Sequence, residues 1–169
     1  MKLSGAINKH KEIAYYSSLP IAFDGFLECD GLCDGPYALY CVDKRPAEPK
    51  RGYVPSYNFE ILAYGSKVGY ISLRVGYTKS LYYSGQIGYA VDAPQRGKGY
   101  AGVACRLLIP LMRAHGMSEI IITNNIDNTA SRKVCEKLGA RLLRAVKLPR
   151  SHELYKAGDR SKNIFLWEI

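Results

Sequence analysis

The sequence lacks long hydrophobic runs, and none of its runs approaches the roughly 18 apolar residues of a membrane-spanning helix. The N-terminal segment through Tyr16 has no apolar stretch typical of a secretory signal, so we expect none. Cysteine is scarce, with five in 169 residues, and Cys29 and Cys33 have no second Cys or His pair at metal-ligand spacing. These absences predict a cytoplasmic protein with reduced thiols and neither a metal nor a membrane partner.

Acidic residues are fewer than basic ones, 15 against 24, which gives a formal net charge of +9. The basic residues are scattered along the chain, and no helix-turn-helix, RNA-recognition or zinc-finger pattern is present, so we expect no nucleic-acid partner. The charge fits an anionic cofactor together with a solvated surface. Repeats, low-complexity tracts and linkers are also missing, which predicts one domain over residues 1–169, poorly specified over 1–35.

Alternating and helical patterns of apolar residues follow one another along the chain. They predict strands over 37–42, 57–64, 67–75, 87–91, 120–123, 141–148 and 163–169, and helices over 100–115 and after Asn128. Residues 76–85 and 149–161 are expected to be loops, and residues 15–23 to cover one side of a sheet. Pro110 falls inside the first predicted helix and predicts a kink there, because proline lacks the N–H that would bond to the Arg106 carbonyl.

A glycine-rich loop follows the strand pattern Ile87–Val91 and leads into a helix at Gly99. The first amides of a helix, together with its dipole, favour an anion. Gly97 and Gly99 allow a phosphate to approach the backbone, and Arg96 and Lys98 add positive charge. The loop is therefore predicted to bind a phosphate-bearing cofactor.

Two motifs overlap in this loop. Gly97, Gly99 and Gly102 form a G-x-G-x-x-G pattern, which in dinucleotide-binding folds needs an acidic residue about 20 positions later, at the end of the next strand. The next strand pattern, Glu119–Thr123, is followed by Asn124 instead, and too few residues remain for a doubly wound sheet. A dinucleotide site is therefore excluded.

The second motif is Arg-x-x-Gly-x-Ala over Arg96–Ala101. It resembles the pyrophosphate loop of the GNAT (GCN5-related) acetyltransferases, and the segment Asn128–Gly139, which opens with Asn and closes with Lys-x-Gly, resembles a later helix of the same family. The resemblance covers residues 54–148 and, less closely, the C-terminal strand. It implies a mixed α/β (α+β) fold, a single GNAT-type domain with a central, mixed, mostly antiparallel sheet of about six or seven strands flanked by helices.

The resemblance implies acetyl-CoA as co-substrate. Backbone amides of the loop would hold its pyrophosphate, and an amide at the end of the preceding strand would stabilise the oxyanion. The residues expected to contact the cofactor are Val91, Arg96, Gly97, Lys98, Gly99, Tyr100, Ala101, Asn128 and Ser131. Helix capping alone is the alternative role for Asn128 and Ser131.

The catalytic groups are harder to assign. The strand positions that often supply the base in this family hold Gly85 and Gln86, which cannot accept a proton near pH 7. Glu60 and Asp92 are candidates by sequence proximity only, and deprotonation through water is an equal alternative. Cys135 occupies the position where many GNAT enzymes carry a Tyr acid. It is a weak candidate acid, and a buried packing role next to the cofactor is favoured for it.

These expectations describe an acetyl-CoA-dependent N-acetyltransferase, in which a primary amine of a small molecule, peptide or protein attacks the thioester directly. The alternative is a catalytically weak GNAT-fold protein that binds acyl-CoA. The N-x-x-S form of the second motif is similar to that of the ribosomal-protein N-terminal acetyltransferases and of many small-molecule enzymes, so the acceptor stays open. The sequence is compatible with a homodimer.

Overall fold

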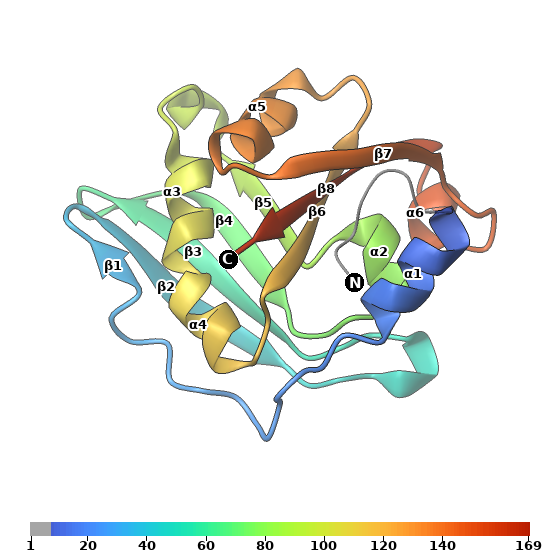
Figure 1. Ribbon diagram of the computed structural model, residues 1–169. Coiled ribbons are helices and arrows are strands. Elements are labelled where there is room, and N and C mark those ends of the chain that lie inside the picture. Colours follow the sequence, from blue (N-terminus) through green and yellow to red (C-terminus); the bar gives the residue numbers. More distant parts are fainter. Residues whose placement is uncertain (1–7) are drawn as a thin grey trace. The chain divides into compact units, whose positions relative to one another are not determined.

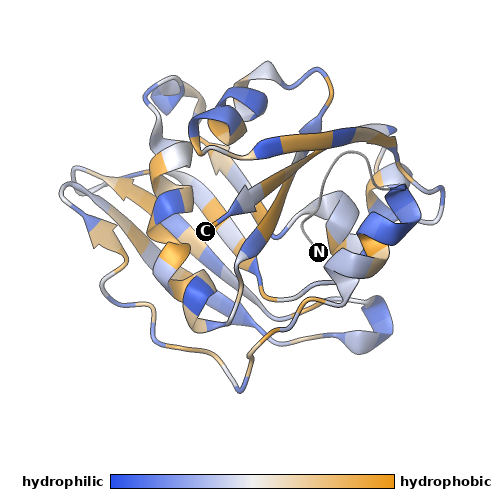
Figure 2. Cartoon of the chain, in the orientation of Figure 1, coloured by the Kyte–Doolittle hydropathy of each residue, from blue (hydrophilic) through white to orange (hydrophobic). Residues whose placement is uncertain are grey.

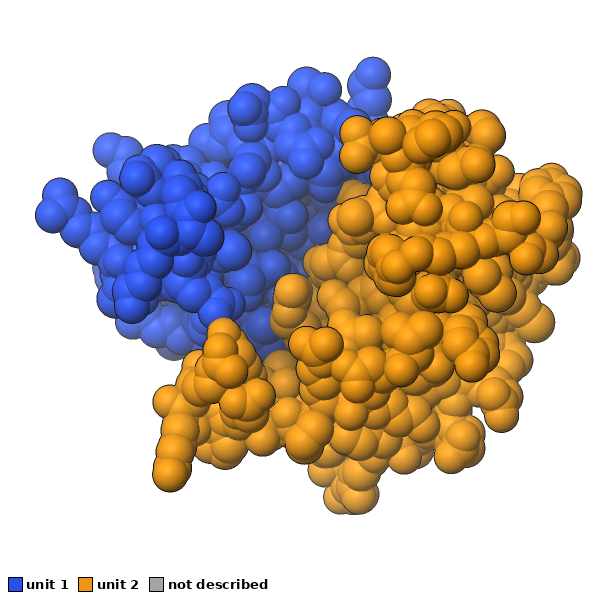
Figure 3. All heavy atoms as spheres, turned by 180° about the vertical axis from the view of Figure 1, so that it is seen from behind, with its two compact units in different colours: residues 1–20, 77–85, 119–168 blue, residues 21–76, 86–118, 169 orange. Residues whose placement is uncertain are grey.

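The structure, a computed structural model, describes residues 8–169, which form eight strands and six α-helices (Figure 1). Contacts divide these residues into two compact units, coloured separately in Figure 3. Unit 1 contains residues 8–20, 77–85 and 119–168, and unit 2 contains residues 21–76, 86–118 and 169. The expected single domain over 1–169 stays a prediction, and its first seven residues lie outside the described part.

Unit 2 is built on a five-stranded antiparallel sheet with the strands in sequence order. The strands are β1 (Cys33–Asp34), β2 (Tyr37–Arg45), β3 (Ser56–Ala63), β4 (Ser66–Arg74) and β5 (Ile87–Val91). The strands predicted over 57–64 and 67–75 are confirmed as β3 and β4, which form a hairpin with Ala63 pairing with Ser66 across the turn. Two short 3-10 turns, Pro49–Arg51 and Ala93–Gln95, lie in loops of this unit.

One face of this sheet carries the apolar core of unit 2. Along β3 every second residue is buried, which is the pattern of a strand with one covered face. Helix α3 (Tyr100–Leu107) contacts β2, β3, β4 and β5 and so covers that face. Ala104 and Cys105 of α3 are fully buried.

The helix predicted over residues 100–115 is two helices, α3 and α4 (Ile109–Ala114), which meet at Leu108. Pro110 lies in the first turn of α4, where its missing N–H leaves no bond unmade. The predicted kink is therefore a complete helix break, for the reason the sequence indicated.

Unit 1 holds a three-stranded antiparallel sheet in the order β6–β8–β7. Its strands are β6 (Glu119–Asn125), β7 (Arg141–Lys147) and β8 (Ser161–Glu168), and its helices are α1 (Lys9–Ser17), α2 (Lys79–Ser84), α5 (Thr129–Lys137) and α6 (Glu153–Lys156). In β8 the residues from Lys162 to Trp167 are all buried, so this central strand is covered on both faces. Helix α5 is mainly hydrophilic (Figure 2), and only Cys135 of it is fully buried.

A buried charge cluster ties three elements of unit 1 together. Glu12 of α1 is fully buried. It accepts hydrogen bonds from the Arg144 guanidinium of β7, with Nη2 2.9 Å from Oε2, and from the Tyr82 hydroxyl of α2. Burial, followed by the bond to Glu12, raises the pKa of Tyr82. We call Glu12, Tyr82 and Arg144 the Glu12 cluster.

The fold class is confirmed, and four details differ from the sequence-based expectations. The strands form two antiparallel sheets of five and three strands in place of one sheet of six or seven. The tyrosine-rich segment 76–85 contains α2, which Thr78 caps by accepting the Leu81 N–H at 3.2 Å. The segment 149–161, expected to be a loop, contains α6. In the segment 15–23, expected to cover one side of a sheet, the first residues form the end of α1.

Candidate functional site

The glycine loop leads directly from the edge strand β5 into α3. Gly97 and Gly99 have φ values of 80° and 82°, in the left-handed region that disfavours other residues. A Cβ atom placed on either glycine would meet no atom within 4 Å, so the space in front of this backbone is open. Residues Arg96–Gly99 are all exposed. A bulky anion can therefore reach the main chain here.

Helix α3 presents unbonded amides at this loop. Val103 is the first residue whose N–H bonds back into the helix, to the Gly99 carbonyl at 3.2 Å. The preceding amides, from Gly99 to Gly102, consequently have no intrahelical partner. Gly99 is the N-cap residue and has no side chain to satisfy them. These donors and the helix dipole together favour a bound anion.

The last residue of β5 offers its backbone at an open sheet edge. The Asp92 N–H bonds to the Val68 carbonyl at 2.9 Å, and the Arg74 N–H bonds to the Gln86 carbonyl at 2.8 Å. Because bonding residues alternate along an antiparallel strand, Val91 directs its N–H and C=O away from β4. β5 ends the five-stranded sheet, so this amide lies at the sheet edge.

Side chains of the loop are partly used within the loop itself. The Nε atom of Arg96 donates to the Val91 carbonyl at 3.0 Å, and the Nζ atom of Lys98 donates to Gln95 Oε1 at 2.8 Å. The Tyr100 ring lies 6.1 Å from the Tyr37 ring of β2, between centroids, so it anchors α3 to the sheet.

In unit 1, Asn128 is the N-cap of α5. Its Oδ1 atom accepts the Ser131 N–H at 3.0 Å. The helix ends in its last turn with Gly139 following the cap residue Leu138, at a φ of 79°. Both ends of this helix confirm the sequence prediction, and Asn128 caps it. A contact of Asn128 or Ser131 with a cofactor stays a prediction.

Cys135 is fully buried, and its thiol lies next to the Asn124 side-chain amide. The Asn124 Nδ2 atom lies 3.8 Å from Cys135 Sγ, and Asn163 Nδ2 donates to Asn124 Oδ1 at 3.1 Å. Burial raises the pKa of the Cys135 thiol to about 12. A thiol that holds its proton this firmly is a poor general acid for a leaving thiolate of pKa about 8.5.

The two candidate bases lie in unit 2 and differ in setting. Glu60 of β3 is half-buried, with its Oε1 atom 4.0 Å from Lys67 Nζ. Asp92 is exposed at the start of the glycine loop. Gln86 is fully buried and donates its side-chain amide to the Gly76 carbonyl at 3.0 Å. None of these contacts marks a proton acceptor, so the base stays unassigned.

The model of the acetyltransferase (GNAT) domain family matches residues 40–141, which hold most of β2, the strands β3 to β5, the glycine loop and α5. The chain belongs to the GNAT acetyltransferase family. A search of curated proteins gave no match.

Solved GNAT structures share the fold at low sequence identity. An acetyltransferase from Salmonella typhimurium that modifies the N-terminal serine of a 50S ribosomal subunit protein superimposes with a TM-score of 0.53 and 21% identity, over 71% of this chain and 66% of that one. Mycobacterium smegmatis RimJ, in complex with CoA-disulfide, gives 0.52 and 23%, over 70% and 55%. The microcin self-immunity acetyltransferase MccE, with acetyl-CoA and AMP, gives 0.54 and 20%, over 68% and 61%. The match thus spans less than two thirds of each of these chains.

The candidate site residues fall into two groups. Residues 91 and 96–101 lie in unit 2, at the end of β5 and in the loop that leads into α3, whereas Asn128, Ser131 and the weak catalytic candidate Cys135 lie in unit 1, at the N-cap of α5 and along that helix. Sequence reasoning missed Asn124, which contacts the thiol, and Asn163, which donates to Asn124 because β6 pairs with β8. No local signal in the sequence indicates that pairing.

The described residues carry few other recognisable sites. Between residues 8 and 169 no group of three or more His, Cys, Asp or Glu side chains could hold a metal ion. None of the helices in that range is long and apolar enough to cross a membrane. All five cysteines are free thiols.

Proposed function

We propose that the protein is an acetyl-CoA-dependent N-acetyltransferase. The observation that carries the proposal is the glycine loop, where open space in front of Gly97 and Gly99 faces the unbonded amides of α3. A pyrophosphate accepts bonds from such amides, and each charge-assisted bond contributes about 1.5–3 kcal/mol. The GNAT structures that hold acetyl-CoA or CoA-disulfide support this choice of cofactor.

The open edge of β5 would place the thioester. We assign the Val91 N–H the role of oxyanion donor, because it points away from β4 and a carbonyl oxygen can accept it. Arg96, which bonds to the carbonyl of the same residue, fixes this strand end next to the pyrophosphate loop. The pantetheine arm would then pair with the strand edge.

In the reaction, the nitrogen of a neutral primary amine attacks the thioester carbonyl and forms a C–N bond. The tetrahedral intermediate collapses with cleavage of the C–S bond, and the coenzyme A thiolate leaves. The proton lost by the amine passes to water, and a proton from water reaches the thiolate. A thiolate with a pKa of about 8.5 leaves without a dedicated acid, so Cys135 is a packing residue in this account.

The acceptor is a primary amine of a small molecule, peptide or protein. Peptide N-termini have support from the Salmonella protein, which modifies an N-terminal serine. The five free thiols favour a reducing compartment, and we place the protein in the cytoplasm.

The test incubates the protein with acetyl-CoA and a panel of amines that includes a peptide with a free N-terminal serine and its Nα-formylated counterpart. We expect mass spectrometry to find acetylation, and a thiol reagent to find equimolar free coenzyme A. Tight binding of acetyl-CoA without transfer to any amine would support the alternative, a catalytically weak acyl-CoA-binding protein. Transfer to hydroxyl groups alone would contradict N-acetylation.

A further inference from the structure

A cavity of about 390 Å³ lies within unit 1, between the end of β7 and the start of β8. Its lining residues are Lys147, Leu148, Arg150, Tyr155, Arg160 and Ser161. Three of the six are cationic and none is acidic. Small-molecule pockets in proteins have volumes from about 300 Å³ upward, so this cavity can hold a small ligand.

Arg160 is held in position before any ligand arrives. Its Nη1 atom donates to the carbonyl oxygens of Tyr155 and Asp159, both at 3.0 Å. Its guanidinium carbon lies 4.3 Å from the centroid of the Tyr155 ring. These contacts use only some of the five N–H donors of the group. A guanidinium fixed in this way loses little conformational freedom when it binds an anion.

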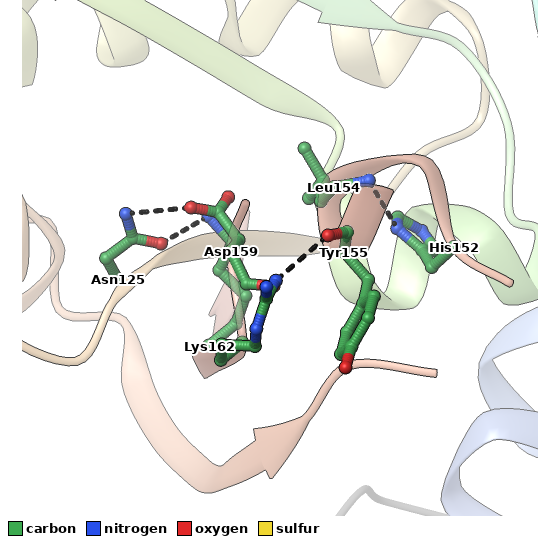
Figure 4. A network of polar contacts seen from close by, with 7 residues as sticks. Asn125, His152, Leu154, Tyr155, Asp159 and Lys162 are labelled. Carbon is green, nitrogen blue, oxygen red and sulfur yellow. Dashed lines mark hydrogen bonds and ion pairs between the residues drawn. The ribbon is translucent and has the colours of Figure 1, made fainter. Parts of the chain in front are cut away.

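The acidic side chain next to Arg160 is engaged elsewhere. Asp159 Oδ2 lies 2.7 Å from Lys162 Nζ, and Asp159 Oδ1 accepts the Asn125 side-chain amide at 3.3 Å (Figure 4). The bond to Lys162 is the main cause of the lowered pKa of Asp159. Across residues 8–169, no carboxylate forms an ion pair with Lys147, Arg150 or Arg160. Three positive charges thus line one cavity and none of them forms an ion pair, although Arg160 contributes to the lowered pKa of Asp159.

We propose that this cavity binds the phosphate group of a small ligand. A phosphate monoester carries about −1.5 to −2 charges at pH 7 and three acceptor oxygens. Three cations exceed the single charge of a carboxylate and match this group better, and the Ser161 hydroxyl adds a neutral donor. The proposal uses none of the residues assigned to acetyl-CoA and does not depend on the proposed function.

A second cavity gives room for the rest of the ligand. It also has a volume of about 390 Å³, and it shares Arg160 and Ser161 with the first. The remaining lining residues are Asn125, Ile126, Asp127, Gly158 and Asp159. Because Asp127 and Asp159 make the second cavity acidic, the part of the ligand that enters it should be uncharged or cationic, while Arg160 holds the phosphate group.

The test is a titration of the isotopically labelled full chain with inorganic phosphate at low ionic strength, followed by NMR. The amide signals of Tyr155 and Ser161 report the cavity, and those of Gly97–Ala101 report the glycine loop separately. We expect saturable shifts at Tyr155 and Ser161. In the double variant Arg150→Gln/Arg160→Gln the phosphate affinity at these amides should fall about tenfold or more for each cation removed. The control Lys133→Gln, at an exposed lysine of α5, should leave it unchanged.

Removal of Arg160 also breaks its bonds to two backbone carbonyls and could therefore disturb the local structure. A second double variant, Lys147→Gln/Arg150→Gln, avoids this, because no such bond exists for these two cations in the described structure. It should weaken phosphate binding by a similar factor. Shifts confined to the glycine loop would overturn the proposal, as would equal affinities in the wild-type chain and both double variants. Equal affinity for acetate and phosphate would overturn the choice of ligand.

Discussion

The glycine loop of unit 2 and the Glu12 cluster of unit 1 are built in opposite ways. The loop is exposed, and its donors are backbone amides that no side chain satisfies. The Glu12 cluster is buried, and its bonds join side chains that are 70 and 132 residues apart in the sequence. The first arrangement leaves interactions unmade for a ligand, whereas the second completes them within the protein. We therefore expect changes in the loop to affect binding, and changes in the cluster to affect stability.

The Glu12 cluster should give the largest effect on stability. Glu12→Ala would leave the Arg144 guanidinium, of which 23% is exposed, without its carboxylate. Breaking a buried ion pair in this way costs roughly 3–5 kcal/mol. The matched control is Glu136→Ala, in an exposed pair with Arg132 on α5, where a loss of only about 0.3–0.5 kcal/mol is expected. Chemical denaturation measures both, and equal losses in the two variants would remove the distinction between the cluster and the surface.

Gly99→Val should abolish acetyl-CoA binding while the protein stays folded. The side chain would occupy the open space in front of the loop, and its φ of 82° would strain the backbone. Gly139→Val, at a φ of 79° after α5, carries the same backbone strain without touching the loop and should bind normally. Calorimetry with acetyl-CoA on both variants separates an effect of the side chain at the loop from an effect of backbone strain alone. Normal binding by Gly99→Val would mean that the cofactor does not lie on this loop.

A smaller effect on acetyl-CoA binding is expected at Asn128, which caps α5 and is also expected to contact the cofactor. Asn128→Ala should lower the free energy of unfolding by about 0.5–2 kcal/mol, the usual value of an N-cap. It should also weaken acetyl-CoA binding several-fold. Asn8→Ala removes the corresponding cap of α1, where Oδ1 accepts the His10 N–H at 2.9 Å. The two variants should lose similar stability, and only the first should lose affinity. Unchanged affinity in Asn128→Ala would reduce its role to capping.

The smallest effect is expected at Cys135. Cys135→Ser should keep most of kcat, because the buried thiol is a packing residue. Because burial raises the pKa of this thiol, the stability of the fold depends on pH. The contribution of the neutral thiol to the free energy of unfolding is complete below the ordinary pKa of 9.0 and is lost as the pH rises toward about 12. At pH 8 a thiol reagent should therefore modify the exposed Cys33 quickly and Cys135 only after unfolding. A fall in kcat of about 100-fold with unchanged acetyl-CoA affinity would instead identify a general acid.

Local signals in the sequence account for the parts of the structure that were predicted correctly. Pro110 lies in the first turn of α4, where it divides the predicted helix. Asn128 caps α5 and Gly139 follows its end, and each effect depends on residues within a single turn. The glycine loop was visible for the same reason. The division into two sheets was not, because it depends on β8 inserting between β6 and β7.

The missed helix α2 illustrates the same limit. Its six residues include two tyrosines and two serines, which favour a helix only weakly. The helix forms where Tyr82 bonds to Glu12 and packs within unit 1. Contacts between residues distant in sequence also create the Glu12 cluster and the chain of contacts from Asn163 through Asn124 to Cys135, so neither could be found from local patterns.

The most direct test of the central claim is calorimetric titration of the protein with acetyl-CoA and, separately, with NAD. Both ligands carry a pyrophosphate, so the comparison asks which cofactor the loop and its surroundings accept. We predict one acetyl-CoA per chain with a Kd in the low micromolar range, about −8 kcal/mol, and no measurable binding of NAD. Preferential binding of NAD, or no binding of acetyl-CoA by the folded protein, would contradict the account.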